Sequence, residues 1–122
     1  MNGLYQKAKE SAVDQVVNES EKFVKADKGK TEWSLIPFEQ LEDVAKVLMM
    51  GAEKYSVDNW KRCDDPKRYK DSLLRHVLSY VNGDCVDKES GKSHLAHAIC
   101  NCLFLMWFDD NKHSLDDDEL DK

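Results

Sequence analysis

The chain has 122 residues, 41% hydrophobic and 34% charged, a composition that fits one helix-rich soluble domain better than a disordered chain. The longest apolar run, within Cys100–Phe108, is too short to cross a bilayer, and MNGLYQKAKE lacks the apolar core of a secretion signal. Residues 109–122 hold seven acids and two lysines and so carry most of the net charge of −6, which leaves residues 1–108 near neutral. We do not expect duplex nucleic acid as a partner, because binding its phosphates needs a basic face. We expect a cytoplasmic protein without a membrane partner, with a flexible acidic tail over residues 109–122.

Two helices are predicted in the first half of the chain. Apolar residues at helical spacing predict a helix over residues 3–24, and the charged stretch KADKGKTEWS then interrupts the pattern. Pro37 suits the first turn of a second helix, in which apolar residues recur from Phe38. This pattern weakens near Gly51 and predicts a helix end by Tyr55.

Two further helices follow a loop, SVDNWKRCDD. Asp65 can cap the third, with Pro66 in its first turn, and Asn82-Gly83 ends it. Ser93 can cap a fourth helix over residues 94–109. No stretch alternates at period two, and two prolines and five glycines are few for a many-stranded fold. We therefore predict an all-α protein, a compact four-helix arrangement forming one domain over residues 1–108.

The fourth helix is apolar on almost every side between Leu95 and Phe108. A helix of this kind is normally covered all round, and a chain of this length has few helices to cover it. Burial in a homo-oligomer interface explains the pattern, and so does a central position in a well-packed monomer. We favour the oligomer.

A line of polar residues interrupts this apolar helix. His94, His97 and Asn101 lie at offsets that place them within about 60° of one another on a helix. A polar stripe on the third helix can face them if the two helices pack antiparallel. Its members are Ser72, Arg75, His76 and Ser79. The acids of the intervening loop would then lie at one mouth of the pair; they are Asp84, Asp87 and Glu89.

Imidazole and carboxylate groups converging in this way are ordinary ligands of divalent metals. A carboxylate accepting from the remote N–H of a ligating histidine would fix its tautomer. The alternative is purely structural: His94 begins a helix, His97 makes a core hydrogen bond, and the acids solvate a turn. Together the two stripes favour the metal site, but their spacing does not select the metal.

A second candidate cluster is basic and aromatic. The stretches KADKGK and GAEKYSVDNWKR offer cations for phosphates and aromatic faces for a base. The residues singled out are Lys30, Lys54, Tyr55, Asn59 and Trp60. Trp60 could equally fill the core, and DKGK is not a P-loop. No pattern typical of nucleophilic catalysis occurs, so water activated by a metal fits better.

Taken together, ADKGK, GAEKYSVDNW, LLRHVLSYVNGD and DKESGKSHLAHA resemble the phage-associated dATP/dGTP diphosphohydrolases, relatives of MazG-type nucleotide pyrophosphohydrolases. The resemblance covers roughly residues 25–108. It implies an all-α, oligomeric enzyme that cleaves purine deoxynucleoside triphosphates into monophosphate and pyrophosphate, in a phage or prophage nucleotide pool. It also implies a divalent ion, usually Mg²⁺ or Mn²⁺, with Co²⁺, Fe²⁺ or Zn²⁺ as alternatives for a histidine-rich site.

The resemblance also suggests roles by position. The metal ligands would be His76, Asp87, Glu89, His94 and His97. Asp87 or Glu89 would accept the proton of the attacking water, and Arg75 with Lys54 would stabilise the leaving pyrophosphate. The nucleotide would contact Lys30, Lys54, Tyr55, Asn59, Trp60 and Arg75.

One departure from the MazG pattern keeps another function open. Those enzymes carry ExxE and ExxD helices, whereas the corresponding stretches here read RHVLS and HLAHA. Glu39 and Glu42 could supply an ExxE pair from the second helix. If the departure means loss of catalysis, the protein would sequester a nucleotide or nucleotide-derived signal, or serve as a helical adaptor.

Overall fold

The computed structural model describes the backbone of residues 21–120 and the side chains of residues 21–112. The chain divides into two units, Met1–Trp33 and Ser34–Lys122. In the described part of the first unit the backbone is irregular, with a turn closed by the Lys30 N–H and the Asp27 carbonyl at 3.1 Å. Most of the helix predicted over residues 3–24 lies outside the described residues. At its expected end, Phe23 and Val24 are exposed and not helical, so that boundary was wrong.

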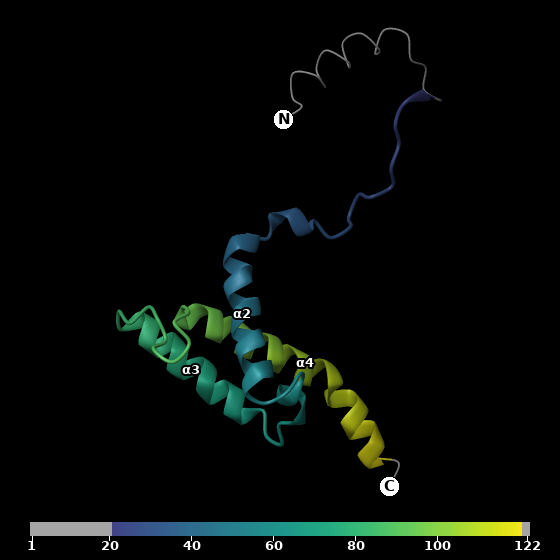
Figure 1. Cartoon of the computed structure of the whole chain (residues 1–122). Helices are drawn as coiled ribbons and strands as arrows, with labels where there is room; N and C mark the ends of the chain where they lie inside the picture. The colour runs from purple at the N-terminus through teal and green to yellow at the C-terminus, as the bar shows by residue number, and fades with distance from the viewer. Residues whose placement is uncertain (1–20, 121–122) are drawn as a thin grey trace. The chain divides into compact units, whose positions relative to one another are not determined.

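The second unit is helical. Within the described residues the structure contains three α-helices and no named strand, which confirms the all-α prediction (Figure 1). A 3₁₀ turn at Trp33–Leu35 precedes α2, Phe38–Lys54. The Pro37 carbonyl accepts from the Gln40 and Leu41 N–H groups, and α2 ends before Tyr55, as predicted.

The loop after α2 is not wholly irregular, because it contains a 3₁₀ turn, η3, at Asn59–Arg62. Helix α3 then spans Lys67–Val81. Asp65 acts as predicted at its start, where Oδ1 accepts from the Lys67 N–H at 3.0 Å. The helix ends at Asn82-Gly83, and Gly83 adopts a φ of +94°, a conformation that suits glycine.

Helix α4 spans His94–Leu120. Ser93 caps it, since its Oγ accepts from the Leu95 N–H at 3.0 Å. The predicted end at residue 109 was wrong by eleven residues. Residues 109–120 contain neither proline nor glycine. Their acidic side chains make the segment polar but do not prevent it from continuing the helix.

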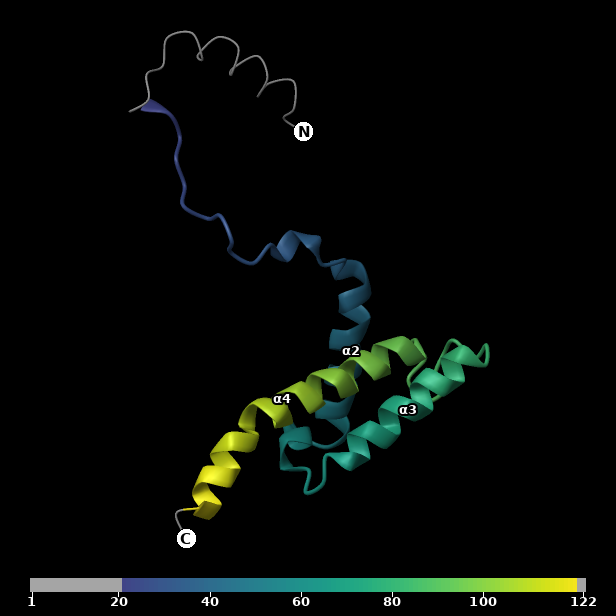
Figure 2. The same ribbon diagram turned by 180° about the vertical axis from the view of Figure 1, so that it is seen from behind.

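Helices α3 and α4 lie side by side in both views, and α2 crosses α4 (Figures 1 and 2). The core joins α2 and α4 through Val44, Ala96 and Cys100, with Leu41 and Phe104 packed around them. Small residues on α4 let the helices approach closely. Hydrogen bonds pair residue 76 with 94 and residue 72 with 101, so α3 and α4 run antiparallel.

None of the helices in the described part of the chain is long and apolar enough to span a membrane.

Candidate metal centre and nucleotide cleft

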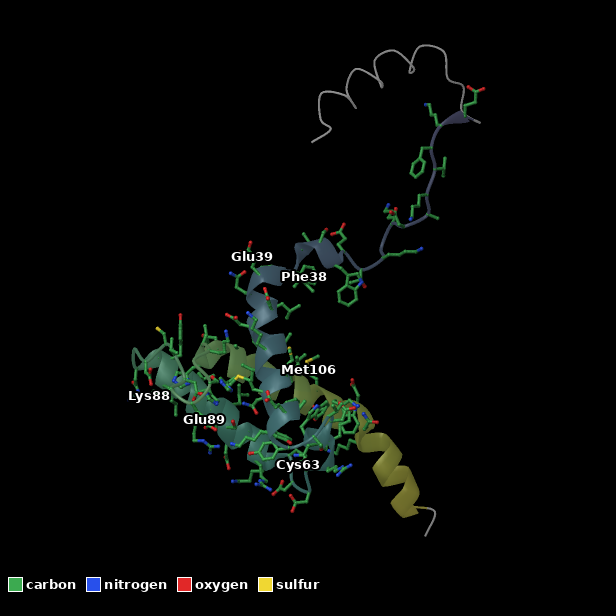
Figure 3. All side chains as sticks on the ribbon, viewed as in Figure 1. Phe38, Glu39, Cys63, Lys88, Glu89 and Met106 are labelled. Carbon is green, nitrogen blue, oxygen red and sulfur yellow. The ribbon has the colours of Figure 1, made fainter. Side chains whose placement is uncertain are left out.

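The loop between α3 and α4 is tightly folded and turns Asp87 inward. An isolated antiparallel bridge joins Val86 to Ser93, and the Asp87 N–H donates to the Lys92 carbonyl at 2.8 Å. The Asp87 Oδ2 in turn accepts from the Ser90 N–H at 2.9 Å. Figure 3 labels Lys88 and Glu89 on this loop. A loop so constrained holds the Asp87 carboxylate in place before any ligand binds.

Two imidazoles meet beside this loop. The Nδ1 atoms of His76 and His94 lie 2.8 Å apart, so one of them must donate to the other. The His94 Nε2–H donates to Asp84 Oδ2 at 3.2 Å, which leaves the His94 Nδ1 as acceptor and His76 as donor. His94 is only 6% exposed. Asp84 therefore occupies the position expected of a carboxylate that fixes the tautomer of a ligating histidine.

His97 supports this pair without joining it directly. Its ring stacks on His76 with centroids 4.5 Å apart and planes at 9°. Its Nε2 lies 2.6 Å from Ser90 Oγ and 3.5 Å from Asp87 Oδ2. Ser90 was missed by the sequence reasoning, although a serine three residues after an aspartate in a turn is a recognisable signal.

The environment sets the charges of the cluster. Burial lowers the pKa of His76, and the neighbouring His97 and His94 lower it further. Burial also lowers the pKa of His97, although Asp87 opposes this. Burial alone would raise the pKa of Asp87, but hydrogen bonds from Ser90 and the adjacent imidazoles hold it below its usual value. His76 and His97 are thus neutral near pH 7 and Asp87 is ionised, the forms that bind metals.

The donor atoms fit a divalent cation. His76, Asp87 and His94 each offer one ligand atom, and all of these lie within 4.8 Å of one another. Metal–nitrogen bonds of about 2.0–2.1 Å at a right angle would place two nitrogens about 2.9 Å apart, close to the observed His76–His94 spacing. For both Nδ1 atoms to be ligands, the His76 hydrogen must shift to Nε2, which neutral imidazole allows.

The other acids predicted or considered as ligands lie elsewhere. Glu89 forms an exposed ion pair with Lys54 at 3.0 Å, outside the three-residue cluster. Glu42 pairs with Lys46 at 3.5 Å. Among the described residues, neither Glu39 nor Glu42 belongs to a cluster able to hold a metal.

A cleft of about 1210 Å³ adjoins the cluster. Every predicted site residue except Lys30 and His94 lines it. The lining site residues come from α2 and the residue after it, η3, α3, the loop between α3 and α4, and α4. Lys30 belongs to the first unit of the chain and is described apart from this cleft. The antiparallel packing of α3 and α4 thus brings the candidate metal ligands and the basic loop to one space.

The aromatic residues divide between two roles. Trp60 stacks on Phe104 with centroids 4.5 Å apart and meets Trp107 edge-on at 5.3 Å. It is therefore packed among rings, which favours the core-filling alternative over a base-stacking role. Tyr55, by contrast, is 64% exposed on the cleft wall and offers an open aromatic face.

A family model described as "dATP/dGTP diphosphohydrolase, N-terminal" matches residues 20–118. The chain belongs to this family. Membership confirms the resemblance read from the sequence motifs, and the matched region contains the whole cluster and cleft. No solved structure matches the chain.

A curated relative of the dATP/dGTP diphosphohydrolase family comes from Salmonella phage PMBT28. It is named "dATP/dGTP diphosphohydrolase" and is 37% identical over 94 residues. The aligned part is 77% of this chain but only 32% of the relative, so the chain spans about a third of that protein's length.

Proposed function

We propose that this chain hydrolyses purine deoxynucleoside triphosphates to the monophosphate and pyrophosphate, using a divalent metal. The observation that supports this most strongly is the shared cleft, which joins a His–Asp–His cluster to cations and an open tyrosine. Family membership and the name of the phage relative agree with it. A phage or prophage nucleotide pool, in the cytoplasm, is the setting we expect.

His76, Asp87 and His94 would hold the metal. When bound, it would neutralise phosphate charge and lower the pKa of water. Two imidazoles and one carboxylate favour Mn²⁺, Co²⁺, Fe²⁺ or Zn²⁺ over Mg²⁺, which prefers oxygen ligands. We therefore expect Mn²⁺ to support more activity than Mg²⁺.

In the reaction, water attacks the α-phosphorus and the bond to the bridging oxygen of the β-phosphate breaks. Asp87 or Glu89 accepts the water proton, and the contacts favour Asp87 because it lies among the imidazoles. Arg75 and Lys54 line the cleft and stabilise charge on the departing pyrophosphate. Tyr55 stacks on the base, and Lys54 must leave Glu89 to reach a phosphate.

The alternative is a protein that binds a nucleotide without hydrolysing it. The observation in its favour is that α3 and α4 present histidines where MazG-type helices present paired carboxylates. Incubation with a panel of nucleotides and divalent metals, followed by anion-exchange chromatography, separates the two. Monophosphate with pyrophosphate supports hydrolysis, whereas recovery of intact, tightly bound nucleotide supports sequestration and contradicts our proposal.

We also propose that the chain forms a homo-oligomer through the outer face of α4. Leu95, Ile99 and Met106 recur at helical spacing there and are 39%, 43% and 60% exposed. Light scattering of the wild type should give a multiple of the 14.1 kDa chain mass. Ile99→Lys should shift it toward the monomer, and a monomeric wild type at micromolar concentration would refute the proposal.

A further inference from the structure

A second cavity, of about 660 Å³, continues the cleft away from the metal cluster. The two cavities are adjacent, because six residues line both of them: Tyr55, Asn59, Tyr69, Ser72, Arg75 and Asn101. His76 and Asp87 of the metal cluster line the cleft, and no residue of the cluster lines the second cavity. The proposed function has so far assigned no part of the substrate to the second cavity.

Three arginines line this second cavity, together with Asp64 and Asp71. Arg62 belongs to η3, whereas Arg68 and Arg75 are seven residues apart on α3 and therefore on one face of that helix. Arg75 lines both cavities. Guanidinium groups are the side chains best suited to bidentate contact with phosphate oxygens.

The arginines are only partly neutralised by nearby acids. Asp71 forms its ion pair with Lys67, at 2.9 Å. Asp64 lies 3.8 Å from Arg68, too far for a hydrogen bond. Among the described residues, Arg62 and Arg75 have no carboxylate within ion-pair distance. Positive charge thus remains available to an anion in this cavity.

We propose that Arg62 and Arg68, with Arg75, form a subsite for the β- and γ-phosphates, the part released as pyrophosphate. This inference rests on the proposed function and orients the substrate within it: the α-phosphate lies at the metal cluster and the terminal phosphates lie among the arginines. Such a subsite favours a triphosphate over a diphosphate, because the γ-phosphate adds contacts that only the triphosphate makes. It also places fixed positive charge where the leaving group becomes more negative.

Direct binding of pyrophosphate to the metal-free protein tests the subsite without turnover. Calorimetry should show pyrophosphate binding to the wild type, weakened about tenfold in Arg62→Gln and in Arg68→Gln, as expected for loss of a charged hydrogen bond. Lys70→Gln is the matched control, since it removes one exposed positive charge from α3 outside the cavity lining. Circular dichroism should show unchanged helix content in all three variants.

Steady-state kinetics then tests the orientation. The Arg62 and Arg68 variants should raise KM for the triphosphate about tenfold, reduce its preference over the diphosphate, and weaken product inhibition by pyrophosphate. Inhibition by the monophosphate and Mn²⁺ affinity should stay at wild-type values.

The subsite is wrong if the wild type binds no pyrophosphate, or if the arginine variants match Lys70→Gln in every measurement. It is also wrong if they weaken inhibition by the monophosphate instead, because the nucleoside would then lie among the arginines. If the wild type binds pyrophosphate through Arg62 but hydrolyses nothing, the subsite stands and the proposed hydrolysis fails.

Discussion

The metal cluster beside the cleft and the arginines of the second cavity differ in how they are held. In the cluster, His76, Asp87 and His94 are buried or half-buried and held by hydrogen bonds before any ligand arrives. In the second cavity, Arg62 and Arg68 are exposed and cationic and make few internal contacts. If our proposals are right, the cluster is preorganised for a small cation, whose ligands must be fixed closely, while the arginines attract a mobile polyanion by charge.

The largest effect should come from His94→Ala. This substitution removes a proposed ligand and leaves Asp84 without its hydrogen-bond partner, so activity should fall by about 1,000-fold, or about 4 kcal/mol of transition-state stabilisation. The measurement is kcat/KM with Mn²⁺, together with Mn²⁺ affinity by paramagnetic resonance. Circular dichroism must show retained helix. Wild-type-like turnover in a folded variant would contradict the proposed role of His94 as a metal ligand.

Asp87 and Glu89 provide a matched pair of acids on the same loop. Asp87→Asn should cost about 100-fold in kcat, because the amide oxygen can still bind the metal but can no longer accept the water proton. Glu89→Gln should cost less than about tenfold, because Glu89 pairs with Lys54 at the exposed rim, where such pairs contribute little. If Glu89→Gln lost more activity than Asp87→Asn, Glu89 and not Asp87 would be the proton acceptor.

The supporting partners should matter less than the ligands. Asp84→Asn and His97→Ala should each lower Mn²⁺ affinity by about 10- to 100-fold, the range found for groups that orient metal ligands. Paramagnetic resonance titration with Mn²⁺ measures both variants. Affinities equal to the wild type would show that the cluster tolerates movement and is not preorganised.

The smallest effect concerns the pH dependence of stability in chelator-treated protein. Because the folded-state pKa values of His76 and His97 are lowered, the unfolded chain binds more protons once the pH falls below the ordinary histidine pKa of about 6.5. The free energy of unfolding should therefore decrease as the pH falls from about 7.5 to about 5.5. Urea titrations should show a weaker pH dependence in His76→Gln than in the wild type. Stability that rises on acidification would contradict the neutral, buried cluster.

Much of this arrangement could be predicted from the sequence because it depends on spacing along helices. The polar stripe containing His94 and His97 follows from helical periodicity, and the short loop to α3 makes an antiparallel partner with His76 the simplest solution. Local signals also placed the starts of α3 and α4, since Asp65 and Ser93 cap them through residues only two positions away.

Contacts between residues distant in the chain could not be predicted in the same way. The Lys54–Glu89 pair joins residues 35 apart, and the packing of Trp60 against Phe104 depends on how η3 meets α4. The length of α4 was misjudged because the acidic residues after Phe108 were taken as the end of the helix, although charge alone does not end a helix. The second cavity became visible only once η3 and α3 were placed together.

The most direct test is the anomalous diffraction of a crystal grown with Mn²⁺ and a non-hydrolysable deoxynucleoside triphosphate. We predict a manganese peak within bonding distance of His76, Asp87 and His94, with the α-phosphate beside it and the terminal phosphates toward Arg62 and Arg68. A peak at Glu39 and Glu42, or no ion between the imidazoles of a nucleotide-bound protein, would contradict the assignment of the metal centre.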